Sequence, residues 1–318
     1  MTMKQKKNII IDRVISRIEA LSKNESLRGH ALEENRKFFE AVRSLPLYLL
    51  WLALGTPTLE KNRVPSFSEL DPEGWGKDFQ EELLHFERSR FPSILTPLCS
   101  EIIKMIHRIP DTGGRPMILA SIGCGPMELE RRILKALLKG KIRHPVVIFG
   151  IDASEHAINA AYENLSKCRI PTMEVPEVTA DFVKDFLFTG NERHRVVLCK
   201  RDVLEISNCF PPGGIDLAYH RNLKHRLPEI RANALDNMLE EASSRSIEAG
   251  EYRGWYLLFL SAWLGWRFPI LANDLVFTNL RSPKKSELRK TERKSGTRIK
   301  IIPGGGYIKV RDMRYQPI

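Results

Sequence analysis

The chain has 318 residues, 42% of them hydrophobic, which is enough for one large packed domain or for one domain with a substantial appendage. Its 50 Lys and Arg residues outnumber 39 Asp and Glu and give a net charge of +11, which favours acidic partners such as nucleotides, nucleic acid or anionic lipid head groups. The most apolar run, residues 45–54, is about half as long as a membrane span, so we expect no transmembrane helix.

Cysteine usage and the N-terminus indicate the compartment. Five cysteines show neither a Cys-x-x-Cys pair nor regular spacing, so we expect no zinc site, no other metal site and no disulfide framework. The N-terminus becomes amphipathic and charged directly after its first lysines, unlike a secretory signal peptide. We therefore predict a cytoplasmic protein; the sequence does not indicate its oligomeric state.

The first hundred residues have helical periodicity. Apolar residues at 11, 14, 15, 18 and 21 share one helical face, residues 28–51 form a second apolar-rich segment, and residues 77–109 are again helical, with a break near Pro92 and Pro97. We predict that residues 1–110 form a helical cap and that residues 111–318 form an α/β domain.

Residues 117–152 read as one βαβ unit. A short apolar strand ends at Gly123 and Gly125, a helix follows over 128–139, and a second strand leads to Asp152. Glycines allow the backbone to approach a ligand, and the start of a helix offers unpaired N–H groups. An acid that ends the next strand is placed to accept hydrogen bonds from two ribose hydroxyls. This unit therefore predicts a nucleotide-type site.

The rest of the chain continues the α/β pattern. Ser154 is a predicted N-cap of the next helix, and residues 262–277 carry tryptophans that we expect in a core. The remaining predicted elements are an insertion over 166–193 with an extra helix at 178–187, strands at 196–199, 215–219 and 255–260, a helix at 223–249, and a hairpin within 297–313.

These residues resemble the class I S-adenosylmethionine-dependent methyltransferases. The first motif of this family reads roughly acid-x-Gly-x-Gly-x-Gly, and its second motif is the acid that ends strand two. Ser121 stands where the family usually has Asp or Glu, and Met127 stands where it usually has the third glycine. The resemblance covers residues 117–313. It implies a three-layer α/β sandwich with a seven-stranded, mostly parallel sheet, an antiparallel last strand and an N-terminal helical cap.

The resemblance also implies a bound cofactor, S-adenosyl-L-methionine. Asp202 then contacts the adenine amino group, and the next backbone N–H, that of Val203, meets a ring nitrogen. Arg88 and Arg90 would reach the cofactor carboxylate, although solvated surface arginines are the alternative. Asp202 and Asp152 have the alternative role of turn or helix caps. The implied cofactor contacts are Ser121, Gly123, Cys124, Gly125, Asp152, Ala153, Asp202, Val203 and Arg90.

The candidate catalytic residues follow the strand at 215–219. The carboxyl end of a central strand is where open α/β sheets place ligands. His220 is a candidate general base, because its unperturbed pKa is near neutrality, and Tyr219 is a second catalytic candidate. Arg221 and Asn222 are candidate substrate contacts, and this pair is locally similar to protein-glutamate methyltransferases of the chemotaxis type. The alternative for His220 is a structural hydrogen bond.

Methyl transfer to a small-molecule or lipid-like acceptor is the function that the resemblance favours. RNA or protein is the alternative acceptor, and an inactive cofactor-binding or nucleic-acid-binding scaffold is the alternative from another class. A nicotinamide-dependent dehydrogenase is disfavoured, because the third glycine is missing. Residues 281–300 carry nine basic residues and two acids, which predicts either a solvated loop or a contact with nucleic-acid phosphates.

Overall fold

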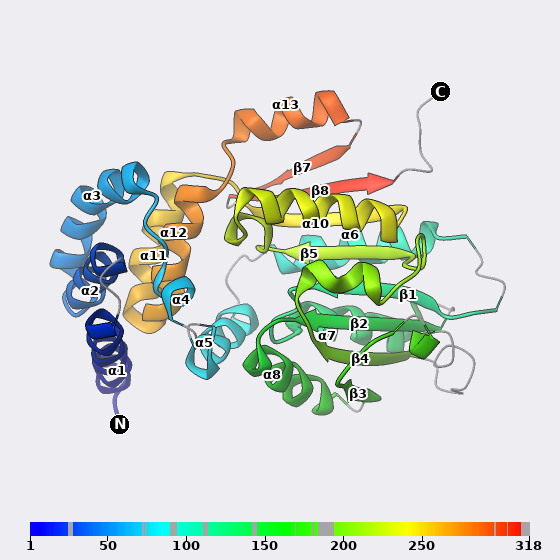
Figure 1. Cartoon of the computed structure of the whole chain (residues 1–318), viewed down its shortest axis with the longest axis horizontal. Helices are drawn as coiled ribbons and strands as arrows, with labels where there is room; N and C mark the ends of the chain where they lie inside the picture. The colour runs from blue at the N-terminus through cyan, green and yellow to red at the C-terminus, as the bar shows by residue number, and fades with distance from the viewer. Residues whose placement is uncertain are drawn as a thin grey trace. The chain divides into compact units, whose positions relative to one another are not determined.

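The computed structural model describes residues 1–24, 28–71, 73, 75–89, 94–110, 114–141, 145–168, 170–179, 181–183, 194–295, 297–303 and 305–312. The chain forms two compact units, one from residues 1–83 with 251–284 and the other from 84–250 with 285–318 (Figure 1). This division differs from a boundary at residue 110. The helix at 95–108 belongs to the second unit, and the first unit also includes the later residues 251–284.

The first unit is helical. Asn273 joins its N-terminal and C-terminal segments, because it donates to Asn35 Oδ1 over 3.0 Å and accepts from the Phe67 N–H over 3.0 Å. No described helix is both long and apolar enough to cross a membrane. The helices of this unit are α1 (Met3–Asn24), α2 (Gly29–Val42), α3 (Leu45–Asn62), α4 (Phe67–Leu70), the first part of α5 (Lys77–Arg88), α11 (Trp255–Arg267) and α12 (Pro269–Arg281).

The second unit is built on an eight-stranded sheet with the order β3-β4-β2-β1-β5-β6-β8-β7. Strand β1 pairs in parallel with β2 and β5, and β7 pairs antiparallel with β8. The predicted α/β fold with a mostly parallel sheet and N-terminal helices is confirmed. The strands are β1 (Met117–Ile122), β2 (Val146–Asp152), β3 (Thr172–Val175), β4 (His194–Lys200), β5 (Leu217–Arg221), β6 (Arg245–Glu251), β7 (Arg298–Ile302) and β8 (Gly306–Asp312).

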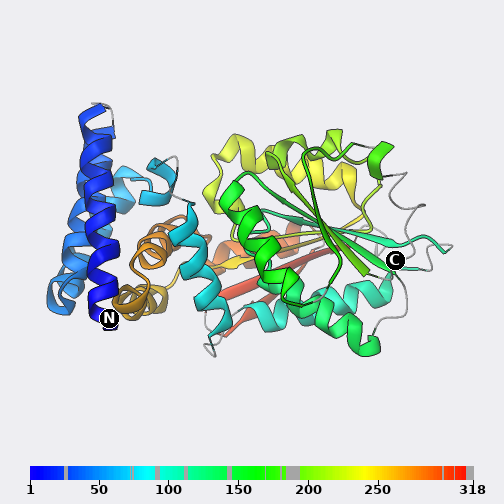
Figure 2. The ribbon, with the colours of Figure 1, turned by 90° about the horizontal axis from the view of Figure 1, so that it is seen from below.

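Helices cover both faces of the sheet. Helix α10 (Glu229–Ala242) and the 3-10 helix η3 (Val203–Asn208) pack on one face, and α6 (Leu95–Arg108), α7 (Glu128–Ala136) and α8 (Glu155–Ser166) pack on the other. Figure 2 shows α10 and α6 on opposite sides of the twisted strands. All six residues of β1 are buried, as expected for a strand that is covered on both faces. A short π-helix, η2 (Leu137–Lys141), extends α7, and α13 (Lys285–Ser295) precedes the β7–β8 hairpin.

Several predicted elements differ from the structure. The sheet has one strand more than predicted, because β3 pairs with β4 inside the stretch that we expected to be an insertion. Half of the residues of the predicted helix at 178–187 lie outside the described part of the chain, and of the others residues 181–183 are helical. The predicted strand at 255–260 is wrong: these residues belong to α11, and the strand is β6. A short continuous apolar run does not separate a strand from a helix. The two tryptophans of residues 262–277, Trp263 and Trp266, are 48% and 52% exposed, so their placement in a core is also wrong.

Candidate functional site

The predicted glycine turn joins β1 to α7. Gly123, Gly125 and Met127 all have positive φ, at 62°, 54° and 54°. The N–H groups of Gly123 and Cys124 donate to the Ile151 carbonyl over 2.8 and 3.1 Å, which holds the turn against the end of β2. Left-handed backbone costs a non-glycine residue about 1 kcal/mol. Met127 nevertheless keeps the conformation that suits a third glycine.

Gly150 of β2 explains how Met127 is accommodated. A Cβ at Gly150 would lie 2.8 Å from Met127 Sδ, so the methionine side chain occupies the space that the absent side chain leaves. Met127 is 1% exposed and belongs to the core on the α7 face. The packing of this buried side chain offsets the strain of its backbone. The departure of Met127 from the family pattern therefore leaves the shape of the turn intact.

Asp152 ends β2 beside this turn. Its Oδ2 accepts from the Gly125 N–H over 3.0 Å, and its Oδ1 accepts from the Ser154 N–H over 2.9 Å. Burial raises the pKa of Asp152, and the two N–H groups oppose that effect. Each carboxylate oxygen has a second lone pair, so Asp152 can still accept from a ligand. The same residue therefore links the glycine turn to the start of α8 and keeps acceptors for hydroxyl groups.

Two of the predicted cofactor contacts, Ala153 and the proposed adenine contact Asp202, meet at the carboxyl ends of β2 and β4. Ala153 and Asp202 line one open depression of about 510 Å³ together with Glu177, Lys200 and Arg201. Asp202 also caps η3, because its Oδ1 accepts from the Leu204 N–H over 3.0 Å, and its other oxygen pairs with Arg231 of α10. Burial would raise the pKa of Asp202, but these two partners outweigh it and lower the pKa.

Val203 follows Asp202 and is 5% exposed in the core under α10, so its side chain is covered by protein. Cys124 is also buried, and burial raises the pKa of its thiol well above the ordinary value. These two predicted cofactor contacts can therefore offer a ligand their backbone more readily than their side chains.

A buried acid that the sequence analysis missed lies beside Ser121. The Ser121 hydroxyl donates to Glu130 Oε1 of α7 over 2.6 Å. Glu130 is 2% exposed, and burial raises its pKa to about 7 against the effect of the Ser121 hydroxyl. The apolar residues at 133, 134 and 137 form the inward face of this helix. Glu130 comes three, four and seven positions before them and therefore lies on the same face, which is the sequence signal for a buried acid. The family pattern has an acid at the position of Ser121 on the first strand. In this chain helix α7 places the carboxylate of Glu130 next to Ser121 instead.

Tyr219 and His220 are adjacent on β5 and point to opposite faces of the sheet. Tyr219 is the register partner of Ser121 and is 1% exposed in the core on the α7 face. Burial and the neighbouring Glu130 raise the pKa of the Tyr219 hydroxyl. Full burial favours a structural role for Tyr219 over the predicted catalytic one.

His220 lies on the α10 face, 4% exposed, where it lines a cavity of about 190 Å³ with Asp236, Glu248 and Lys309. Burial lowers the pKa of His220, while the cross-strand partner Glu248 opposes this shift. The imidazole is therefore neutral at pH 7 and able to accept a proton. Among the described residues, its Nδ1 has no hydrogen-bond partner.

Glu248 is the acidic centre of the His220 cavity. Its Oε1 accepts from the Tyr307 hydroxyl over 2.6 Å, and Lys309 Nζ lies 3.5 Å from Oε2. Burial would raise the pKa of Glu248, but His220, Lys309, Lys224 and the Tyr307 hydroxyl outweigh it and lower the pKa to about 2. Glu248 is therefore ionised throughout the physiological range.

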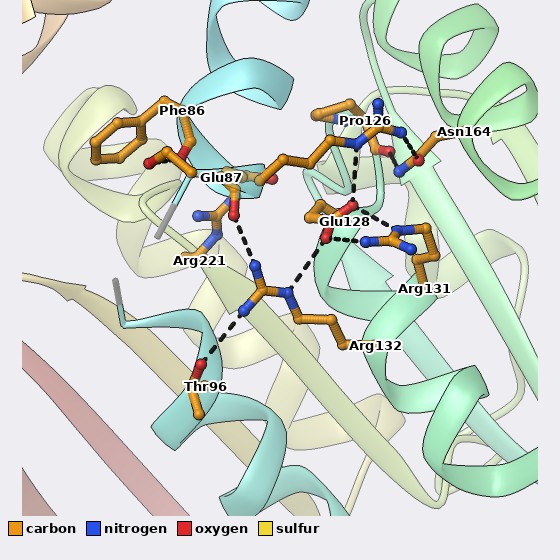
Figure 3. Close-up of polar contacts among 11 residues, drawn as sticks. Phe86, Glu87, Thr96, Pro126, Glu128, Arg131, Arg132, Asn164 and Arg221 are labelled. Atoms are coloured by element: carbon orange, nitrogen blue, oxygen red, sulfur yellow. Dashed lines mark hydrogen bonds and ion pairs between the residues drawn. The ribbon is translucent and has the colours of Figure 1, made fainter. Parts of the chain in front are cut away.

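A cluster of arginines surrounds Glu128, the first residue of α7 (Figure 3). Arg131 holds the buried carboxylate with two bonds of 2.5 and 2.6 Å, Arg132 Nε lies 3.2 Å from it, and Arg88 Nε lies 3.6 Å from it. Burial would raise the pKa of Glu128, but Arg131 and Arg132 outweigh it and lower the pKa. Arg88 also donates to Asn164 of α8, which ties α5, α7 and α8 together.

Arg221 joins the same cluster. It pairs with the buried carboxylate of Glu87, and Arg132 donates to the Glu87 carbonyl over 2.6 Å (Figure 3). The four arginines outnumber the two glutamates, so this edge of the sheet attracts anions. Arg221 thus lies on the α7 side, whereas His220 lies on the α10 side. Asn222 has a φ of 52°, and its N–H donates to the Ala249 carbonyl over 2.9 Å.

Arg90 lies outside the described residues. Within the basic segment 281–300, residues 285–295 form helix α13 and residues 298–300 begin β7, so most of the segment is not a loop. Lys284, just before α13, is exposed, as are Lys285, Arg289 and Lys290 on the helix. Its contact with phosphates stays a prediction. Within the described part of the chain, no group of three or more His, Cys, Asp and Glu side chains is arranged to hold a metal ion.

Comparisons with known proteins were made with the sequence and with the structure. No family model and no curated protein matches the sequence. Among solved structures, the methyltransferase domain of bacterial CtHen1 is 15% identical over 68% of this chain and 96% of its own, with a TM-score of 0.42. The carbon methyltransferase CurJ is 11% identical over 93% of this chain and 70% of its own, with a TM-score of 0.48. The mitomycin 7-O-methyltransferase MmcR is 14% identical over 87% and 70%, with a TM-score of 0.45. At these identities and TM-scores, the likeness to these three methyltransferases concerns the fold alone.

Proposed function

We propose that the chain binds S-adenosyl-L-methionine at the Gly123–Gly125 turn and transfers its methyl group to an acceptor. One observation carries this proposal: Asp152, at the end of β2, hydrogen bonds directly to the Gly125 N–H of the turn. The turn follows the central strand β1, which lies between β2 and β5, where the strand order changes direction. Open α/β sheets bind nucleotide ligands at such a point.

Each end of the proposed ligand has matching groups. Asp152 would accept from the ribose hydroxyls, and the depression lined by Ala153 and Asp202 would take the adenine. Ser121 and Glu130 provide a carboxylate at the methionine end, where the cofactor carries positive charge. The surplus of arginine around Glu128 supports binding of the cofactor carboxylate at the same edge, with Arg90 as a further proposed contact.

The two departures from the family pattern do not favour an inactive scaffold. Met127 keeps the left-handed backbone of a glycine, and Glu130 restores an acid beside Ser121. The scaffold hypothesis depended on these two positions, so we favour an enzyme. S-adenosylmethionine supplies an activated methyl group when bound, and alignment in a water-poor site can provide most of the rate.

The acceptor is the open part of the proposal. Neutral His220 can take a proton from a hydroxyl or amine, and its cavity of about 190 Å³ has the scale of a small polar group. This supports a small-molecule acceptor as the first choice, with Arg221 and Asn222 as proposed substrate contacts. RNA or protein is the second choice, through the basic helix α13.

Replacement of Asp152 tests the proposal. Charge-assisted hydrogen bonds contribute about 1.5 to 3 kcal/mol each, so Asp152→Ala should weaken binding of the methyl donor and of its demethylated product by at least about tenfold. Asp152→Asn should weaken it less, because one acceptor oxygen remains. Calorimetric titration of both ligands measures these affinities, and melting temperatures are recorded alongside.

Glu155→Ala is the matched control. It removes an exposed acid from the first turn of α8 and leaves the glycine turn untouched. If Asp152 only caps α8, Asp152→Ala should lower stability by about 1 kcal/mol, Glu155→Ala should lower it less, and both should leave affinity in the folded fraction unchanged. That result would contradict the proposed cofactor site.

A further inference from the structure

Helix α11 exposes a stripe of aromatic side chains. Trp255 is 76% exposed, Phe259 70%, Trp263 48% and Trp266 52%. These residues recur at intervals of four, four and three, so they lie along one face of the helix. The opposite face is packed in the helical unit, where the Tyr48 hydroxyl of α3 donates to Ser261 Oγ over 3.2 Å. The stripe is therefore an outward surface of a folded helix.

The size of this aromatic stripe decides between two kinds of partner. A fully exposed aromatic side chain offers about 150 to 250 Å², so the four together expose on the order of 500 Å² of mostly apolar surface. Patches of this size on single proteins mark interaction sites. A stable protein interface buries about 800 Å² per partner, so the stripe alone is too small for a second copy of the chain.

The charges around the aromatic stripe are basic. Residues 252–273 contain no Asp or Glu, and Arg267 directly follows Trp266. The ammonium of Lys7 in α1 lies 4.7 Å from the centre of the Trp266 ring. Lys7 is buried and donates to the Val42 carbonyl over 2.7 Å, whereas Lys4, one helical turn earlier, is exposed, so Lys4 and Arg267 are the cations available to a partner near this end of the stripe. This arrangement complements a negatively charged surface.

We propose that α11 binds the surface of an anionic lipid bilayer, with its aromatic stripe in the head-group region. Tryptophan is enriched at the boundary between lipid and water. A helix with aromatic residues on one face and nearby Lys and Arg binds such a surface without spanning it. The predicted cytoplasmic location would bring the chain to the leaflet that carries anionic lipids. This surface is independent of the glycine turn and of the proposed cofactor.

Vesicle co-sedimentation of the full chain tests the proposal. The chain should bind vesicles of phosphatidylcholine with phosphatidylserine, and pure phosphatidylcholine vesicles should bind it less. Trp255→Ala with Phe259→Ala should reduce the partition coefficient by about tenfold or more, because these are the two most exposed aromatic residues of the stripe. Lys4→Glu with Arg267→Glu should reduce binding to the anionic vesicles by about tenfold and should affect neutral vesicles little.

The control variant is Ile230→Ala, which removes an apolar side chain that is 84% exposed on α10. It should bind like wild type, and equal melting temperatures would establish that all variants are folded. Absence of binding to anionic vesicles at low salt would overturn the proposal. So would a dimer in solution, seen by light scattering, that the Trp255 and Phe259 substitutions dissociate, because the aromatic stripe would then be covered by a second copy.

Discussion

Glu130 and Glu248 are carboxylates on opposite faces of the same sheet, Glu130 buried and Glu248 nearly so, with its side chain 13% exposed, and their pKa values are shifted in opposite directions. The pKa of Glu130 is raised to about 7, whereas that of Glu248 is lowered to about 2. Burial raises both. Glu130 has the Ser121 hydroxyl as its side-chain donor and a like charge, Glu128, nearby. Glu248 faces His220 and two lysines in addition to a hydroxyl.

The difference shows that the surrounding charges, and not the degree of burial, set the ionisation state here. Glu248 stays charged and holds the α10 side of the sheet together as a fixed ionic centre. Glu130 changes its charge near neutral pH, beside the turn where we propose that a cation binds. The acid that stabilises the fold and the acid suited to a ligand can thus be told apart by their partners.

Loss of Glu248 should have the largest effect. Glu248→Leu leaves Lys309, Lys224 and His220 without their shared carboxylate, so we expect a loss of about 3 to 5 kcal/mol in the free energy of unfolding. Urea denaturation measures it. The control is Glu174→Leu, an exposed acid on β3, which should change stability by less than about 0.5 kcal/mol. Equal effects of the two variants would contradict a central role for Glu248.

The pH dependence of Glu130 should have the next largest effect. Its folded pKa lies above the ordinary glutamate value of 4.5, so the native state holds a proton that the unfolded chain releases between pH 4.5 and about 7. Wild type should therefore lose stability through this group as pH rises across that range, by about 3 kcal/mol. Glu130→Gln removes this pH-dependent loss, so the free energy of unfolding of the variant, relative to that of wild type, should be higher above pH 7 than at pH 4.5. Parallel curves of unfolding free energy against pH would show that Glu130 titrates normally.

The smallest effect is expected for Ser121→Ala. It removes the hydroxyl that donates to Glu130 over 2.6 Å, and loss of such a bond to a buried carboxyl group costs about 1 to 2 kcal/mol. The pKa of Glu130 should rise further, which would move the midpoint of its pH profile to higher pH. The double variant Ser121→Ala with Glu130→Gln should show a smaller loss than the sum of the single changes. Full additivity would mean that the two residues do not interact.

The sequence predicted the local parts of the fold well. The stretch from β1 through the glycine turn to Asp152 was predictable, because strand, turn and helix there depend on neighbours within a few residues. Ser154 was predicted as an N-cap, and its Oγ accepts from the Ala157 N–H over 3.3 Å. The run at 255–260 was misassigned as a strand, although its aromatic residues at 255 and 259 already had helical spacing.

The candidate site was less predictable, because its pairs join distant elements. Residues Glu87 and Arg221 come together through the end of α5 and the end of β5, and His220 meets Glu248 only because β5 and β6 are neighbours in the sheet. No spacing in the sequence encodes these contacts. Glu130 is the exception, since an acid in register with the apolar face of α7 was visible before the fold was known.

The return of the chain to its helical unit has a consequence for synthesis on the ribosome. Residues 1–83 emerge first, yet Asn35 and Phe67 meet Asn273 only after the whole sheet segment from 84 to 250 has been translated. At about 5 to 20 residues per second, the early helices wait roughly ten to thirty seconds for α11 and α12. During that time the apolar faces that later pack against these helices are open to solvent. The nascent chain should therefore depend on chaperones that shield such surfaces, and release of a chain that stops before residue 251 should yield an aggregation-prone product.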